Sequence, residues 1–299
     1  MKNGLILMMI TLTLSTLSFA SHSWNGRIFH APTQQEISLK KLTAGIIQFP
    51  IIILGEKHNT PAIQLAQSEI MNNAVKAKHA ENLFITAWEF LNYTDQDNIN
   101  TAYKNFVSGK IDALSFLQET QGTTNNKSYI PILETTKALK GQIIGVNISR
   151  EAKDPVVKGG IEALDPKYLP PDFAMGSLEY HQRFVEIMDG HSPPETIENY
   201  YAAQCLTDDI MAYTLHKYFN TPLLFLITGS FHTDFFQGVV NRLYIRNNKS
   251  VAVIRFIDAS DYDEAELNET LPKILYDKTY GTIADYVYFV NEPNTNVIK

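Results

Sequence analysis

The chain has 299 residues, of which 44% are hydrophobic, and its formal net charge is −7 at pH 7. This length and apolar content suit one large α/β domain or two smaller ones. The negative charge excludes the electrostatic footprint of a nucleic-acid-binding protein and argues against a polybasic contact with anionic lipid. Cys205 is the only cysteine, so an exported form of this chain has no internal disulfide.

Residues 1–20 have the pattern of a secretory signal peptide, because Lys2 precedes an apolar core that ends at Ser18-Phe19-Ala20. The apolar part is too short and too rich in Thr and Ser for a membrane span. We therefore expect cleavage near Ala20, export to the periplasm or outer envelope, and a single α/β domain over residues 21–299. No cysteine lies near the cleavage point, so we expect no lipid anchor on an N-terminal cysteine.

Five apolar runs, rich in β-forming residues, are predicted to be strands. They span residues 50–54, 83–88, 142–146, 223–228 and 250–257. None alternates strictly, which is typical of strands buried on both faces. Segments with helical spacing lie between them, at residues 61–78, 129–139 and 236–247. This order of strand and helix predicts an α/β fold with a mostly parallel sheet flanked by helices.

The alternation of predicted strands and helices stops between residues 161 and 220. This segment has only helical spacing, interrupted by "LPPDF" and "HSPPE". We predict that this segment is a helical insert packed over the carboxyl ends of the strands. A shorter helical region, residues 95–117, follows the second strand and is expected to pack in a similar way.

Two strands end in the same polar pattern, an apolar run followed by Gly-x-x-His. The patterns are "IIILGEKH", which ends at His58, and "LLFLITGSFH", which ends at His232. The carboxyl ends of parallel strands line one edge of a sheet, so Glu56, His58, Glu89 and His232 are expected to converge there. Two imidazoles and two carboxylates suit a divalent metal or an oriented water. Alternatively, the carboxylate of Glu56 caps the next helix, and the histidines are hydrogen-bonded structural residues.

The insert supplies a second set of candidates: Tyr180, His181, His191, Tyr200, Tyr201, Gln204, Asp208 and Met211. Tyr201, Gln204, Asp208 and Met211 follow one another at three- and four-residue steps and share one helix face. Polar Gln and Asp beside Met suggest a face that meets the crevice. The alternative is an ordinary amphipathic helix whose Tyr and Met side chains pack in the core.

Five motifs, taken in order, resemble those of a known family. They are "LGEKHNT", "AWEFLNYTDQ" with Glu89 and Gln96, "GVNISREAKDPVVKGGIEAL", "YYAAQCLTDDIMA" and "TGSFHTDFFQGVVNRL". The chain is similar to the ChaN-like haem-binding uptake proteins of bacteria, within the Tiki superfamily. The resemblance implies an α/β core with a helical subdomain, export to the cell envelope, and haem binding as a homodimer for iron uptake, with peripheral membrane contact.

The resemblance also implies where function resides. An axial ligand for ferric haem would be a Tyr or His of the insert, which leaves Tyr180, His181, His191, Tyr200 and Tyr201 open. The wider superfamily includes metal-dependent proteases and an erythromycin esterase. By that analogy Glu56, His58, Glu89 and His232 would hold a divalent metal or act as catalytic groups.

Two main hypotheses follow. In the first, the chain is an exported haem-binding protein of iron uptake. In the second, it is a metal-dependent hydrolase of an amide or ester, in which a metal ion or a histidine base activates water. A partner-binding protein with a vestigial site remains a third reading.

Overall fold

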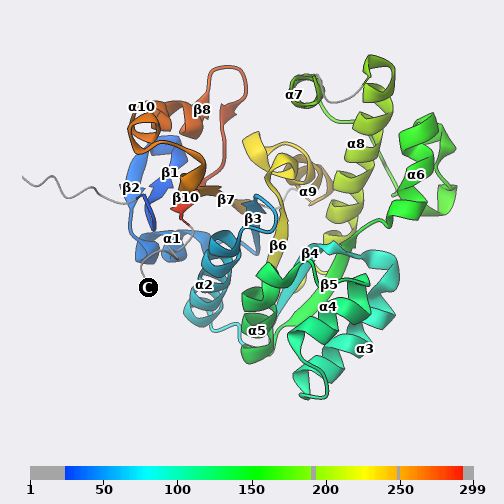
Figure 1. Ribbon diagram of the computed structural model, residues 1–299, viewed down its shortest axis with the longest axis horizontal. Helices are drawn as coiled ribbons and strands as arrows, with labels where there is room; N and C mark the ends of the chain where they lie inside the picture. The colour runs from blue at the N-terminus through cyan, green and yellow to red at the C-terminus, as the bar shows by residue number, and fades with distance from the viewer. Residues whose placement is uncertain (1–23, 190–192, 248–249, 292–299) are drawn as a thin grey trace, which may run out of the picture.

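The computed structural model describes residues 24–189, 193–247 and 250–291 (Figure 1). The predicted signal peptide and His191 lie outside these residues. The main sheet has eight strands in the order β2-β1-β10-β7-β3-β6-β4-β5. Its central strands are β3 (Ile51–Glu56), β4 (Phe84–Asn92), β5 (Gln142–Asn147), β6 (Leu223–Gly229) and β7 (Val251–Asp258). All five predicted strands are therefore present, and the predicted α/β fold is confirmed.

Adjacent central strands are parallel. Ile51 of β3 pairs with Leu224 of β6 on one side and with Val251 of β7 on the other. β4 continues the parallel sheet from β6 to β5. The carboxyl ends of β3, β4 and β6, where Glu56, His58, Glu89 and His232 lie, thus point to the same edge of the sheet.

The other strands were not predicted. β1, β2, β8 and β9 have only two or three residues each, too few to give a clear apolar run, whereas β10 is a five-residue apolar run that the sequence analysis missed. β10 (Tyr286–Val290) extends the sheet in parallel beside β7. β1 (Ile28–His30) and β2 (Gln35–Ile37) then close that edge as antiparallel strands. β8 (Tyr276–Asp277) and β9 (Gly281–Thr282) form a separate two-stranded pair.

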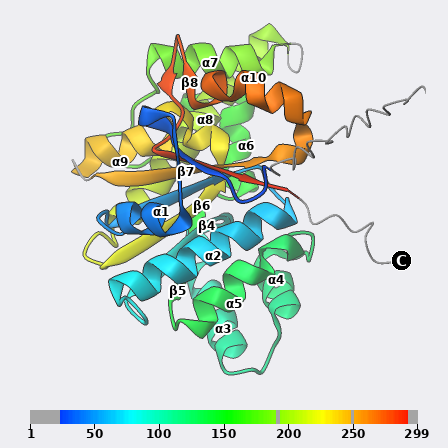
Figure 2. The ribbon, with the colours of Figure 1, turned by 90° about the vertical axis from the view of Figure 1, so that its left-hand side faces the viewer.

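Helices cover both faces of the sheet, as Figure 2 shows. α2 (Pro61–Lys78) begins at the proline expected at a first helical position, and it ends before His79 in a left-handed conformation. The other helices are α1 (Leu39–Ile46), α3 (Gln96–Val107), α4 (Ala113–Gln121), α5 (Ile130–Ala138), α6 (Arg150–Gly159), α7 (Leu178–Met188), α8 (Pro194–His216), α9 (Val239–Asn247) and α10 (Glu264–Leu275).

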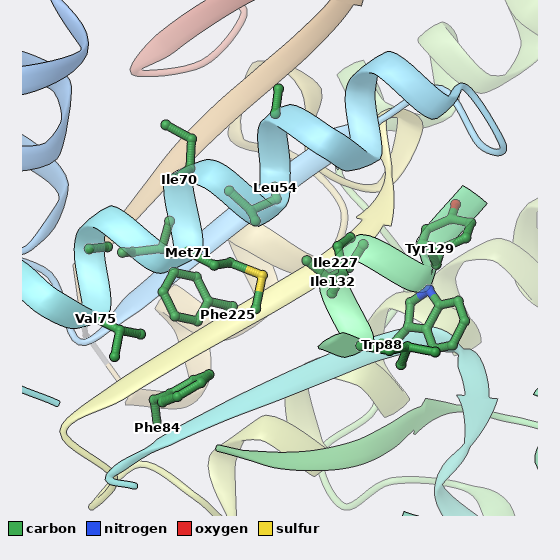
Figure 3. Packing of buried hydrophobic residues seen from close by; sticks show 14 of the residues in the cluster. Leu54, Ile70, Met71, Val75, Phe84, Trp88, Tyr129, Ile132, Phe225 and Ile227 are labelled. Atoms are coloured by element: carbon green, nitrogen blue, oxygen red, sulfur yellow. The ribbon is translucent and has the colours of Figure 1, made fainter. Parts of the chain in front are cut away.

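The sheet separates the core into two layers, and successive side chains of β3 point alternately into one layer and the other. Ile52 and Leu54 pack into the layer of α2 and α5, where Figure 3 shows Leu54 near Ile70 and Met71 of α2. Ile51 and Ile53 pack against α8 and α9 on the other face. All four side chains are fully buried. Each such side chain contributes about 1.5–3 kcal/mol when it is removed from water, so both faces of the sheet fix its position.

The described part of the predicted insert contains no strand; α7 and α8 make up most of it, and turns and irregular backbone lead from residue 169 to α7. The insert has two functions in the fold. The carboxyl half of α8 packs Met211 and Leu215 against the sheet. The preceding turns bring Gln204 and Asp208 over the carboxyl end of β6, where both contact His232. This is the position predicted for the insert. Within the residues that the structure places, no helix has the length and apolar character needed to cross a membrane.

Candidate functional site

Glycines bring the backbone of β3 and β6 close to the polar side chains at the sheet edge. A Cβ added at Gly229 would lie 2.8 Å from Nε2 of His58. A Cβ added at Gly55 would lie 2.4 Å from Oγ1 of Thr233. Contacts this short mean that a Cβ at either position would displace the side chain of His58 or Thr233, so glycine is favoured by packing in each Gly-x-x-His motif.

Glu89 reaches the site because β4 is irregular near its end. The register between β4 and β5 shifts between Trp88 and Asn92, and a bulge of this kind redirects a side chain. Oε2 of Glu89 accepts hydrogen bonds from the amide of Gly229 and from Oγ1 of Thr228, each at 2.7 Å. The carboxylate of Glu89 is therefore fixed to the end of β6.

The first imidazole, His58, pairs with one carboxylate. Its Nδ1 donates to Oε1 of Glu56 at 3.0 Å. The same carboxylate accepts from the hydroxyl of Tyr129 and, at 3.0 Å, from Nε2 of Gln64. Glu56 is buried, but 39% of the His58 side chain is exposed. The imidazole of His58 thus faces solvent while a buried carboxylate holds it in orientation.

The second imidazole, His232, lies between two carboxylates. Its Nδ1 donates to Oδ1 of Asp208 at 2.6 Å, and its Nε2 lies 3.3 Å from Oε1 of Glu89. The hydroxyl of Tyr180 donates to Oδ2 of Asp208 at 2.7 Å. The amide nitrogen of Gln204 lies 3.2 Å from that hydroxyl. A continuous hydrogen-bonded chain therefore runs from Tyr180 on α7 to the end of β6.

These contacts change the protonation of both histidines. Burial alone would lower the pKa of His232, but the charges of Glu89 and Asp208 and their hydrogen bonds raise it to about 10. Burial alone would also lower the pKa of His58, but its hydrogen bond to the carboxylate of Glu56 and the charge of Glu89 outweigh this, and the net pKa of His58 is raised. Burial would raise the pKa of Glu89, yet His232 lowers it well below its ordinary value. His232 and Glu89 are thus a buried ion pair at neutral pH.

Sequence reasoning placed Glu56, His58, Glu89 and His232 correctly at one edge but missed several of their partners. Tyr129 and Gln64 lie on predicted helices, and no local pattern marks them as site residues. Lys153, on α6, donates to Oγ1 of Thr207 at 3.1 Å. Burial lowers the pKa of Lys153, and this effect outweighs the charges of Glu89 and Asp208, which raise it. The motif "NISREAK" gave the only sequence signal for that lysine.

The candidate haem ligands of the insert occupy different environments. The hydroxyl of Tyr201 donates to the carbonyl of Ser177 at 3.3 Å, and the rings of Tyr180 and Tyr201 are 5.8 Å apart. Both tyrosines are buried, whereas Tyr200 is 37% exposed.

The remaining candidates of the insert are either paired or packed. Nε2 of His181 lies 2.8 Å from Oε1 of Glu198. Met211 is buried and receives a contact from Oγ1 of Thr228 at 3.8 Å. Tyr200 and His181 are therefore the candidates that reach solvent, and His191 lies outside the described residues.

The four residues at the sheet edge do not form a metal centre as they are arranged. Among residues 24–189, 193–247 and 250–291, no group of three or more His, Cys, Asp and Glu side chains is placed to hold a metal ion. Glu56 instead accepts from Tyr129 and Gln64, and Glu89 accepts from Gly229 and Thr228. The donor atoms are directed at one another rather than at a common point.

The chain was compared with known families and structures. A family model described as haem-binding uptake, Tiki superfamily, ChaN, matches residues 43–243. This is about two thirds of the 299 residues, and the chain belongs to this family, as its motifs predicted. The match includes β3, β4, β6 and both helices of the insert. No curated protein matches the sequence.

One solved structure shows the same fold. The structure of ChaN of Campylobacter jejuni, described as having cofacial haem binding, is similar with a TM-score of 0.67 and 22% identity, covering 88% of this chain and 96% of that one. The type III effector HopBA1 has a TM-score of 0.47 and 12% identity, covering 85% and 94% of the two chains. The erythromycin esterase EreC has a TM-score of 0.44 and 10% identity, covering 78% and 76%. The last two similarities are too weak to bear on function.

Proposed function

We propose that this protein binds haem, between the helical insert and the carboxyl edge of the sheet. The observation that carries this proposal is the family match over residues 43–243, which includes both regions. Tyr180, Phe184 and Tyr201 of the insert form an aromatic cluster with Phe231, which follows β6. Aromatic and apolar walls with a few polar groups are what a large flat cofactor requires.

The iron of a bound haem takes an axial oxygen or nitrogen ligand from the protein. Tyr200 and His181 suit this role best, since their side chains reach solvent. The hydroxyl of Tyr180 is buried and donates its hydrogen bond to Asp208. Burial and the charge of that carboxylate raise the pKa of Tyr180 well above its ordinary value. Loss of the Tyr180 proton to form a phenolate ligand would therefore be costly.

A hemin titration of the purified protein tests the proposal. We expect a Soret band that shifts and saturates at a defined stoichiometry. Tyr200→Phe and His181→Ala should each be compared with Tyr262→Phe, because Tyr262 has the same 37% exposure as Tyr200 but lies before α10. A shift of the band in one insert variant and none in Tyr262→Phe identifies the ligand. Absorbance that grows without saturation contradicts haem binding.

We also propose that the protein is exported and serves haem or iron uptake in the cell envelope, as a homodimer with peripheral membrane contact. The signal-peptide pattern of residues 1–20 and the family support this. Fractionation of cells that express the full chain is expected to place the mature protein outside the cytoplasm. Light scattering with and without hemin should show the mass of a dimer. Retention of residues 1–20 in a cytoplasmic product would contradict export.

A second candidate function is hydrolysis of an ester or amide, and the geometry of His58 favours it. A half-exposed imidazole oriented by a buried carboxylate is the arrangement of a general base. His232 is unsuited to that role, because its raised pKa keeps it protonated at neutral pH. Purified protein should be assayed on ester and amide substrates beside His58→Ala. Equal rates for the two proteins would remove this candidate.

A further inference from the structure

Two hollows of about 410 and 240 Å³ lie next to each other along α9, and Arg242 and Ile245 line both. The segment from Pro171 to Ser177 forms the opposite wall. Neither hollow includes His58, Glu89 or His232. Tyr180 lines the smaller hollow and connects it through Asp208 to the sheet edge.

Arg242 is a buried cation that lacks a full set of partners. Its residue is only 7% exposed, and its Nη2 is buried with no hydrogen-bond partner among the residues described by the structure. Asp209, which also lines the larger hollow, is already engaged by Arg246. Nε and Nη2 of Arg246 donate to its two oxygens at 3.0 and 2.7 Å. A buried guanidinium nitrogen in a cavity wall is destabilising unless water or an anion completes its hydrogen bonds, and an anion also balances its charge.

The smaller hollow has the chemistry of an anion site. Arg242 is its only charged lining residue, and Ser177, Gln237 and Asn241 add polar groups. Oε1 of Gln237 accepts from Nε of Arg183 at 2.7 Å, which fixes the orientation of that amide. A guanidinium in such surroundings pairs best with a planar carboxylate, because its parallel N–H groups match the two oxygens.

The rim of the same hollow is apolar and exposed. Met175 and Ile245 line it and are 41% and 69% exposed. Exposed apolar side chains grouped around a buried charge mark a binding site for an amphiphile. The volume of about 240 Å³ accommodates a carboxylate arm, while a flat apolar body would cover the rim.

We propose that Arg242 binds a propionate carboxylate of haem in this hollow, with the macrocycle lying over Met175 and Ile245. This inference rests on the proposed haem binding and specifies how the cofactor is oriented. Arg242 is a positioning residue here, since it contacts the carboxylate and not the iron.

The test compares two ligands and three proteins. Hemin and hemin dimethyl ester, whose propionates carry no charge, are titrated into the unaltered protein, Arg242→Gln and Arg150→Gln. Arg150 is the control because its side chain is 90% exposed on α6. We expect hemin affinity to fall roughly 10- to 100-fold in Arg242→Gln and to be unchanged in Arg150→Gln. The ester should bind the unaltered protein and Arg242→Gln equally, and about as weakly as hemin binds Arg242→Gln.

The outcomes separate the two proposals. If the unaltered protein binds hemin and its dimethyl ester with equal affinity, the role of Arg242 is wrong and haem binding stands. This comparison needs no variant, so it holds even if Arg242→Gln does not fold. If Arg242→Gln is folded and binds hemin like the unaltered protein, the inference also fails. If the unaltered protein shows no saturable hemin binding, both proposals are overturned.

Discussion

The two Gly-x-x-His motifs end neighbouring strands with the same spacing, but their histidines differ in environment. His58 is 39% exposed in its side chain and pairs with one carboxylate, Glu56. His232 is 10% exposed in its side chain and lies between Asp208 and Glu89. The difference arises from α8, whose Gln204 and Asp208 cover His232 and leave His58 uncovered.

One sequence pattern has therefore produced two residues with different roles. His232 is a buried cation that ties β6 to β4 and to α8, so its main effect is on stability. His58 remains accessible and keeps Nε2 directed at the open backbone of Gly229. Of the two imidazoles, His58 is therefore the more accessible to a molecule in solution.

The largest predicted effect is the loss of the buried cation. His232→Ala would leave Asp208 and Glu89 buried without their counter-charge, and we expect the free energy of unfolding to fall by about 3–5 kcal/mol. His58→Ala removes a half-exposed imidazole whose interaction is screened by solvent, so a loss of about 0.5–1.5 kcal/mol is expected. Urea unfolding of both variants measures these values. A smaller loss for His232→Ala than for His58→Ala would reverse the comparison.

The pH dependence of stability should follow His232. Folding raises its pKa from about 6.5 to about 10. Its contribution to stability is therefore complete below about pH 6.5, declines above that, and is lost as the pH rises through about 10. Urea midpoints measured between pH 6 and 10 should fall for the unaltered protein and fall less for His232→Gln. Parallel curves for the two proteins would show that His232 is not the group responsible.

A smaller effect is expected at the glycine beside His58. In Gly229→Ala the new Cβ would meet Nε2 of His58 at 2.8 Å, so the imidazole must shift. We expect about 1–3 kcal/mol of destabilisation and a changed pKa for His58, measured by NMR of its ring proton. Gly159→Ala is the control, because its Cβ would lie at an easier 3.2 Å from Cβ of Ala163. An unchanged His58 resonance in Gly229→Ala would contradict the packing described.

Much of the fold was predictable from the sequence because the central strands are buried on both faces. Short, continuous apolar runs such as residues 223–228 are typical of strands that are buried on both faces of a sheet. Pro61 likewise marks the first residue of α2. β1 and β2 were not predictable, since three-residue strands at one side of a sheet depend on partners far along the chain. β10, with the sequence YVYFV, carried the same apolar signal as the predicted strands and was missed. The order of strands in the sheet is likewise set by long-range pairing that leaves no local pattern.

The candidate site was predictable only in part. Parallel strands place Glu56 and His232 at one edge, and that step follows from topology alone. The partners of these residues come from distant helices, as with Tyr129 on one face and Asp208 on the other. The burial and the pKa values of the site residues depend on those partners, which the spacing of residues in the sequence does not reveal. For this reason the sequence suggested a metal site, whereas the structure has hydrogen-bonded pairs. Gln96 is a further example, because its side chain bonds to Gly145 and Ile143 of β5 rather than to the site.

The most direct test of haem binding at the insert is amide hydrogen exchange with and without one equivalent of hemin. The account predicts slower exchange in α7, in α9 and in the segment from Pro171 to Ser177, and no change in α2 or α5 on the other face of the sheet. Unchanged exchange in α7 and α9, or protection confined to α2 and α5, would contradict it.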